Sequence, residues 1–166
     1  MAITIYEVSV PVFAQKMQAL AAIIEKAEAY ASARKFGADL LLAQRLFPDM
    51  LPFRAQVQLV SDHAKGASAR LAGLEVPRFE DNETTTAELK ARLAKTIDFV
   101  RGIDQAKFDG AEDRPISLKV AGQDRSFTGR QYLLTFALPN FYFHVTTAYD
   151  ILRHTGVELG KGDFMR

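Results

Sequence analysis

The sequence predicts an all-α protein: a four-helix bundle with a short helix after the first long helix and a small β-hairpin between the third and fourth. Four segments place apolar residues at spacings of three and four, which is the pattern of amphipathic helices. Two segments carry the capping-box pattern of a helix N-terminus. No repeat period supports the rival class, helical repeat proteins. A chain of 166 residues can bury its own core, so we expect residues 1–166 to form a single domain.

The first long helix is predicted from one stripe of apolar residues. The stripe consists of Phe13, Met17, Leu20, Ile24, Ala27 and Ala31. Its start is open between two readings: Ser9 caps a helix with Pro11 in the first turn, or the helix begins earlier and bends at Pro11. Gly37 should break this helix, and residues 38–46 are expected to form the short one.

The second long helix is expected from about residue 52 to about residue 72, with Gly73 as its C-terminal stop. At about 100° per residue, six side chains share one of its faces. They are Gln56, Leu59, Val60, His63, Ala67 and Arg70. This face therefore mixes apolar with polar side chains.

The third helix should open at Thr85, because Glu88 follows at the capping-box spacing. Its buried stripe is expected to be Leu89, Leu93, Ile97, Val100 and Ile103. Residues 116–127 then alternate apolar and polar side chains around a turn at residues 121–124, which predicts a β-hairpin. Two strands alone are marginally stable, so the hairpin must lean on the helices or on another subunit. The fourth helix should open at Thr128, with Gln131 completing the capping box, and run to about Thr155.

Composition excludes several classes of function. Lys and Arg number 21 against 20 Asp and Glu, a net charge of +1 that gives no electrostatic reason to expect nucleic-acid binding. Cysteine is absent, which excludes disulfides, thiolate metal ligands and a cysteine nucleophile. No apolar run approaches the ~20 residues of a membrane span, and the N-terminus lacks the pattern of a signal peptide. We therefore expect a cytoplasmic protein that binds neither nucleic acid nor membrane.

Two histidines on separate helices are the candidate site. His63 lies among apolar neighbours on the second helix, and His144 shares a face of the fourth with Asn140 and Ala148. Both imidazoles are expected to point inward, where helical bundles build ligand and metal sites. Pro139 either frees a backbone carbonyl near Thr135 for such a site or only bends the helix. The predicted ligand-binding residues are Gln56, His63, Arg70, Asn140 and His144, and Asp62 is expected to be a surface charge.

Four pieces of the sequence resemble a known superfamily. They are Leu46-Phe47-Pro48-Asp49-Met50, Asp62-His63-Ala64, Ala69-Arg70-Leu71-Ala72-Gly73 and Pro139-Asn140-Phe141-Tyr142-Phe143-His144. Together with the helical framework they are similar to the DinB/YfiT-like superfamily of metal-binding bundles, in an uncharacterised bacterial branch known as a domain of unknown function. The resemblance covers nearly the whole chain, and the last of the four pieces is its most specific part.

The resemblance implies a divalent metal, zinc or nickel, held by one histidine on the second helix and two at i and i+4 on the fourth. His63 matches the first position and His144 the second. The third position falls on Ala148, which cannot bind a metal. His154 is no substitute, because ten residues place it about 80° out of phase and roughly 15 Å along the axis.

Three functions follow as hypotheses. The leading one is a bundle that binds a small molecule in a central cavity lined by the two histidines, with the metal triad incomplete. The first alternative is a zinc- or nickel-dependent transferase or hydrolase that uses His63 and His144. The second is a homodimeric structural or interaction module, since aromatic residues spread around the fourth helix predict a homodimer. No glycine-rich phosphate loop, Gly-x-Ser-x-Gly elbow or His-Glu-x-x-His motif is present, and no catalytic residue is assigned.

Overall fold

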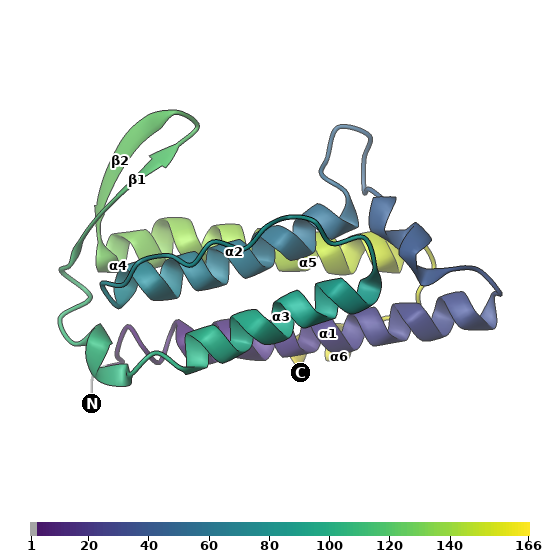
Figure 1. Cartoon of the computed structure of the whole chain (residues 1–166), viewed down its shortest axis with the longest axis horizontal. Coiled ribbons are helices and arrows are strands. Elements are labelled where there is room, and N and C mark those ends of the chain that lie inside the picture. The colour runs from purple at the N-terminus through teal and green to yellow at the C-terminus, as the bar shows by residue number, and fades with distance from the viewer. Residues whose placement is uncertain (1–2) are drawn as a thin grey trace.

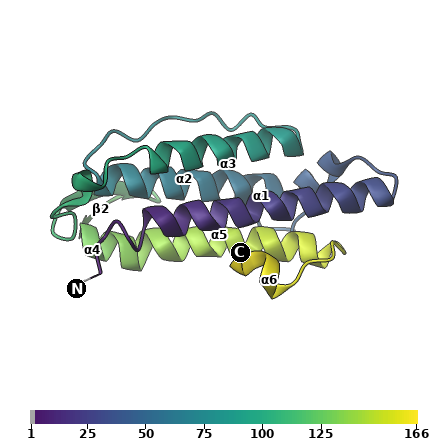
Figure 2. The ribbon, with the colours of Figure 1, turned by 90° about the horizontal axis from the view of Figure 1, so that it is seen from below.

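A computed structural model describes residues 3–166 and confirms the four-helix bundle (Figure 1). The long helices are α1 (Val10–Ala33), α2 (Phe53–Leu71), α3 (Thr86–Arg101) and a last helix made of three consecutive segments, α4 (Gly129–Tyr132), η3 (Leu133–Ala137) and α5 (Leu138–His154). α1 and the last helix run in one direction, and α2 and α3 run in the other (Figures 1 and 2). α2 packs mainly on α5 and α3, and α1 packs mainly on α3.

The apolar stripe predicted for α1 is buried throughout. The helix begins at Val10 with Pro11 in its first turn. Ser9 does not cap it, because its hydroxyl donates to the carbonyl oxygens of Ile5 at 2.6 Å and Tyr6 at 3.3 Å. The short helix expected over residues 38–46 is a 3₁₀ helix, η1 (Ala38–Ala43).

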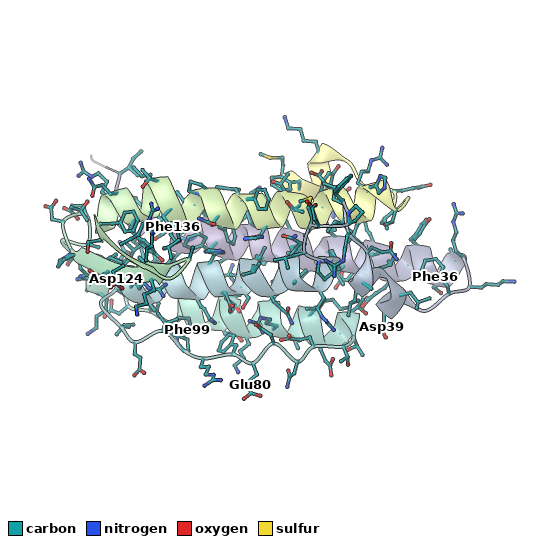
Figure 3. The ribbon with its side chains drawn as sticks, turned by 90° about the horizontal axis from the view of Figure 1, so that it is seen from above. Phe36, Asp39, Glu80, Phe99, Asp124 and Phe136 are labelled. Atoms are coloured by element: carbon teal, nitrogen blue, oxygen red, sulfur yellow. The ribbon has the colours of Figure 1, made fainter. Side chains whose placement is uncertain are left out.

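Arg92 makes several polar contacts with the connection between α2 and α3. Because these two helices run in the same direction, residues 74–85 must return along the length of the bundle (Figures 1 and 2). Arg92 of α3 is 4% exposed and binds this connection and α2. Its guanidinium contacts the Glu80 carbonyl at 2.9 Å and the carboxylates of Glu83, Asp81 and Asp62 at 2.9, 2.8 and 2.8 Å. Figure 3 shows Glu80 on this outer connection. The expectation that Asp62 is a surface charge was wrong, because its carboxylate joins Arg92 and the buried Lys65, the latter at 2.7 Å.

Local polar contacts fix the start of α3. The capping box at its start is confirmed, with the Glu88 N–H donating to the Thr85 hydroxyl at 3.1 Å and the Thr85 N–H to the Glu88 carboxylate at 3.0 Å. The Thr86 N–H also donates to the carboxylate of Asp39 on η1, at 2.8 Å, and Asp39 lies at this end of the bundle in Figure 3. A 3₁₀ turn, η2 (Gln105–Phe108), follows α3.

The predicted hairpin forms from β1 (Pro115–Val120) and β2 (Gln123–Thr128) and projects from one end of the bundle (Figure 1). Its turn has only two residues, Ala121 and Gly122, both with positive φ, as the twist of a tight hairpin requires. Ile116 is buried, and Phe127 contacts Tyr132 and Phe136 of the last helix. The hairpin therefore leans on the helices, as expected.

The last helix contains a π-helical turn immediately before Pro139. Its capping box at Thr128 and Gln131 is confirmed. In η3 the Leu138 N–H donates to the Leu133 carbonyl, five residues back, while the backbone angles at both ends of η3 stay helical. Pro139 has no N–H to offer in the following turn. π turns are rare and occur often at functional sites, so this position directs attention to the residues beside it.

The C-terminal segment α6 (Lys161–Met165) packs on α1. The buried Lys16 donates to the carbonyl of Phe164 at 2.8 Å. Within residues 3–166, no helix is both long enough and apolar enough to cross a membrane.

Candidate functional site

His63 of α2 and His144 of α5 lie side by side between two antiparallel helices. Their ring centroids are 5.3 Å apart and the ring planes are inclined by only 14°. The helical phases that put each ring on an inward face, together with the packing of α2 on α5, bring them together. The structure thus joins two residues that are 81 positions apart in the chain.

The pair lies at the edge of the core rather than deep inside it. Both histidines are partly exposed, whereas Val60 and Ala148 on the same two helices are fully buried. Phe136 meets the His63 ring edge to face at 6.3 Å, and Phe143 meets the His144 ring in the same way at 5.2 Å. Figure 3 shows Phe136 on the last helix, at the end of the bundle that carries the hairpin. Aromatic side chains therefore lie beside both imidazoles, which remain partly exposed.

Gln56 fixes the protonation pattern of His144. This buried side chain donates through Nε2 to the Leu51 carbonyl at 3.0 Å, and its Oε1 lies 2.7 Å from Nδ1 of His144. A carbonyl can only accept, so the contact with Leu51 decides which end of the amide faces the imidazole. Nδ1 of His144 must then carry the proton, and Nε2 keeps a free lone pair.

Replacing Gln56 with leucine should leave the Leu51 carbonyl and Nδ1 of His144 without partners. We expect a loss of about 1–3 kcal/mol in the free energy of unfolding. We also expect a mixture of His144 tautomers in place of one. Urea unfolding measures the first effect and the ¹⁵N chemical shifts of the imidazole measure the second. Gln15→Leu, at an exposed position of α1, is the control. A Gln56→Leu protein with wild-type stability and a single His144 tautomer would contradict the role of Gln56 in orienting His144.

Both imidazoles are neutral at neutral pH. Burial lowers the pKa of His63 to about 4, helped by the neighbouring His144 and by the charge of Arg70, while Asp62 acts in the opposite direction. Burial also lowers the pKa of His144. A neutral imidazole has one N–H donor and one lone pair. The pair therefore presents acceptors and donors rather than positive charge.

Asn140 stands one turn before His144 and serves its own helix. Its amide Nδ2 donates to the carbonyl oxygen of Phe136 at 2.7 Å. The π turn and Pro139 leave backbone carbonyls here without the usual helical donor. The Asn140 side chain donates to the Phe136 carbonyl, which is next in sequence to Thr135, whose carbonyl was expected to be freed. The side-chain oxygen of Asn140 is the part left to contact a ligand.

Arg70 lies on the same face of α2 as His63. Its Nη1 donates to the hydroxyl of Tyr132 at 3.2 Å, and the side chain is partly exposed. A Cβ built on Gly66 would lie 2.6 Å from this Nη1. The guanidinium therefore rests over Gly66, one turn back along the helix toward His63, the direction in which long helical side chains extend.

The donor set does not match a three-histidine metal centre. Ala148, at the position where the superfamily has its third histidine, is fully buried, and its methyl group cannot coordinate a metal. Within residues 3–166, no three or more His, Cys, Asp or Glu side chains are grouped as a metal site requires. The oxygen of Gln56 already accepts from His144. Catalytic zinc sites use three protein ligands, and this chain brings two imidazoles together.

Four residues beside the predicted site were not predicted to belong to it. Three are the aromatic side chains Tyr132, Phe136 and Phe143, and the fourth is Gly66, which makes room for Arg70. An isolated glycine inside a strong helical pattern is the one signal that could have been followed, since it costs stability unless packing requires it. Gly66 and Arg70 are four residues apart, so they are neighbours on one face of the helix, and a long side chain at Arg70 could occupy the space above the glycine.

Comparison with known proteins places the chain in context. A family model described as a domain of unknown function (DUF1993) matches residues 5–165. The crystal structure of a DinB family member protein from Shewanella denitrificans is similar with a TM-score of 0.90 and 40% sequence identity, over 97% of this chain and 91% of that one. No curated protein matches. These similarities extend over the whole bundle, including both histidine-bearing helices.

Proposed function

We propose that this chain, which belongs to the DUF1993 family and has a DinB-like fold, binds a small organic molecule. The molecule contacts the His63–His144 pair, and no metal ion takes part. One observation carries the proposal. Two neutral imidazoles lie 5.3 Å apart at an accessible edge of the core, and Gln56 holds one of them in a single tautomer. Such preorganisation lowers the entropy that binding must overcome.

The chemistry of the pair selects the part of the ligand that it contacts. Nε2 of His144 accepts a hydrogen bond, so the ligand offers a hydroxyl or a neutral N–H. Phe136 and Phe143 lie beside the two rings and favour an apolar or aromatic body. Phe143 is 56% exposed and Leu51 is 48% exposed, so apolar surface also rims the approach. The ligand is therefore a small amphipathic molecule with at least one hydrogen-bond donor.

The donor set also decides our ranking of the alternatives. A zinc- or nickel-dependent transferase or hydrolase would need a third protein ligand, and Ala148 stands at that position. A homodimeric interaction module remains a prediction, and the exposed Phe143 is where we would look for a second copy. A metal-binding histidine would also have its other ring nitrogen held by a partner such as Gln56, so the missing third ligand decides this ranking.

Phenol, an aromatic ring with one hydroxyl donor, is the probe that tests the proposal. We expect the wild-type protein to bind phenol and both His63→Ala and His144→Ala to bind it about tenfold or more weakly, since each loses a polar contact or its support. Chemical-shift titration of the side-chain and backbone amides measures the affinity. His154→Ala, at an exposed histidine of the same helix, should bind like the wild type.

Two outcomes would contradict the proposal. Phenol affinity unchanged in both histidine variants, with their folds intact by circular dichroism, would exclude the pair as the binding site. Stoichiometric zinc or nickel that survives dialysis in the wild type, and is lost in His63→Ala, would favour the metal-dependent alternative. Metal analysis after loading with each ion distinguishes these cases.

A further inference from the structure

Arg70 is a cation near the histidine pair whose charge no carboxylate neutralises. Within residues 3–166, no carboxylate forms an ion pair with it. Asp62, the acidic residue next to His63 in sequence, is engaged by Arg92 and Lys65 instead. A guanidinium has five N–H donors, and the contact with Tyr132 uses one of them.

The partner that Arg70 does have is neutral. Tyr132 is 2% exposed, and burial raises the pKa of its hydroxyl, although the nearby Arg70 opposes the change. The Tyr132 hydroxyl therefore keeps its proton, and the neutral side chain cannot balance the charge of Arg70. Its role is to hold one nitrogen of the guanidinium in place. The remaining donors stay available on a partly exposed side chain.

Gly66 brings this charge close to His63. The guanidinium lies over Gly66. Among residues 3–166, and apart from the helix backbone and the flanking Lys65 and Ala67, only Arg70 has atoms within 4 Å of a Cβ placed there. Gly66 follows His63 by three residues, a rise of about 4.5 Å on the same face of the helix. A glycine in a helix interior costs roughly 1 kcal/mol relative to alanine. We call the space that the missing side chain of Gly66 leaves for the guanidinium the seat of Arg70. A need for this seat would account for a glycine at this helical position.

The space between Arg70 and the histidines has an aromatic boundary. Tyr132 and Phe136 stack at 5.8 Å, Phe127 of the hairpin contacts both at 6.1 and 5.9 Å, and Phe136 reaches His63. One wall therefore runs from the residue that holds Arg70 to the residue that contacts the histidine pair. A flat ligand that spanned both ends would lie along these rings.

We infer that Arg70, seated on Gly66 and held by Tyr132, binds an oxyanion of the same ligand whose hydrogen-bond donor meets the His63–His144 pair. This inference rests on the proposed function and deepens it. The ligand class is a small organic acid, with a carboxylate or a phosphate at one end, an apolar or aromatic body, and a hydroxyl or N–H at the other end. A planar guanidinium matches the two oxygens of either anion.

A pair of probes that differ only in charge tests the inference. 4-Hydroxybenzoate and 4-hydroxybenzamide share the ring and the hydroxyl, and only the first is an anion. We expect the wild-type protein to bind the benzoate about tenfold or more tightly, and Arg70→Met to lose that preference. Arg153→Met removes one positive charge from an exposed position of α5. This control variant should keep the preference for benzoate. 4-Hydroxyphenyl phosphate, which keeps the hydroxyl donor, shows by the same comparison with 4-hydroxybenzamide whether a phosphate is accepted as well as a carboxylate.

Gly66→Ala separates the loss of the seat from the loss of the charge. The new methyl group must displace the guanidinium, which is the far end of a flexible side chain. Because alanine favours the helix, we expect thermal stability equal to or above that of the wild type. We also expect the preference for benzoate to disappear, although Arg70 is still present. Retention of the preference in Gly66→Ala would overturn the assigned position of the guanidinium.

Failure of this inference is distinguishable from failure of the proposed function. Phenol binding that depends on His63 and His144, with equal affinity for the benzoate and the benzamide, would overturn the anion site and leave the proposed function intact. A preference for benzoate that survives Arg70→Met would also overturn it. A preference that depends on Arg70 but is unchanged in His63→Ala and His144→Ala would overturn the claim that one ligand spans both ends.

Discussion

Arg92→Met is expected to lower the free energy of unfolding by about 3–5 kcal/mol, the typical cost of removing one partner from a buried ionic network. The side chain of Arg92 contacts three carboxylates and one backbone carbonyl. Methionine fills a similar volume but offers no donor to any of them. Asp62 would keep its contact with Lys65, while the Glu80 carbonyl and the nearby carboxylates would lose their main partner.

Thermal and urea unfolding measure this loss. For a chain of this size each kcal/mol corresponds to about 2–4 °C in Tm, so the midpoint should fall by roughly 6–20 °C. Arg101→Met is the matched control, since Arg101 lies on the same helix, is exposed, and donates only to Gln18 at 3.2 Å. A loss below about 1 kcal/mol in Arg92→Met would show that residues 74–85 do not depend on this arginine.

Acidification is expected to destabilise the fold through His63. The pKa of this imidazole lies at its ordinary 6.5 in the unfolded chain and at about 4 in the folded protein. Between those values the unfolded chain takes up a proton that the folded protein does not, so unfolding becomes easier as the pH falls. Stability is complete above pH 6.5, declines toward pH 4, and is not lowered further by this group below it. The difference corresponds to at most about 3 kcal/mol.

Urea unfolding between pH 7.5 and pH 4 tests this pH dependence. His63→Gln should remove most of the decline between pH 6.5 and pH 5, where carboxylates with ordinary or lowered pKa values are still ionised. A residual decline is expected from His144, whose pKa burial also lowers. A curve for His63→Gln that matches the wild type would contradict the assignment.

The helices were predictable from the sequence because their signals are local. Apolar stripes and two capping boxes depend on residues within a few positions of each other, and all of these features are confirmed. The convergence of His63 and His144 followed from helical phase together with the family resemblance. Periodicity also placed Gln56 and Arg70 on the face of α2 that carries His63.

The features that were missed leave no signal in the local sequence pattern. Asp62 was expected to be a surface charge because the helical phase does not reveal that residues 74–85 return along α2 and α3. The π turn before Pro139 has no sequence period of its own. Ser9 matched an N-cap by residue type, but the preceding turn offers its hydroxyl two carbonyl acceptors. In each case a tertiary or turn contact outweighed a local preference.

The shared direction of α2 and α3 also constrains how the chain can reach its native state. In a bundle with short links, each helix can dock on its predecessor as a hairpin, and such local docking is fast. Here α3 cannot meet α2 until residues 74–85 have been drawn out along both (Figure 2). The segment loses conformational entropy when it becomes ordered, and the contacts of Arg92 form only afterwards to offset that loss. We therefore expect the placement of residues 74–85 to limit the rate of folding.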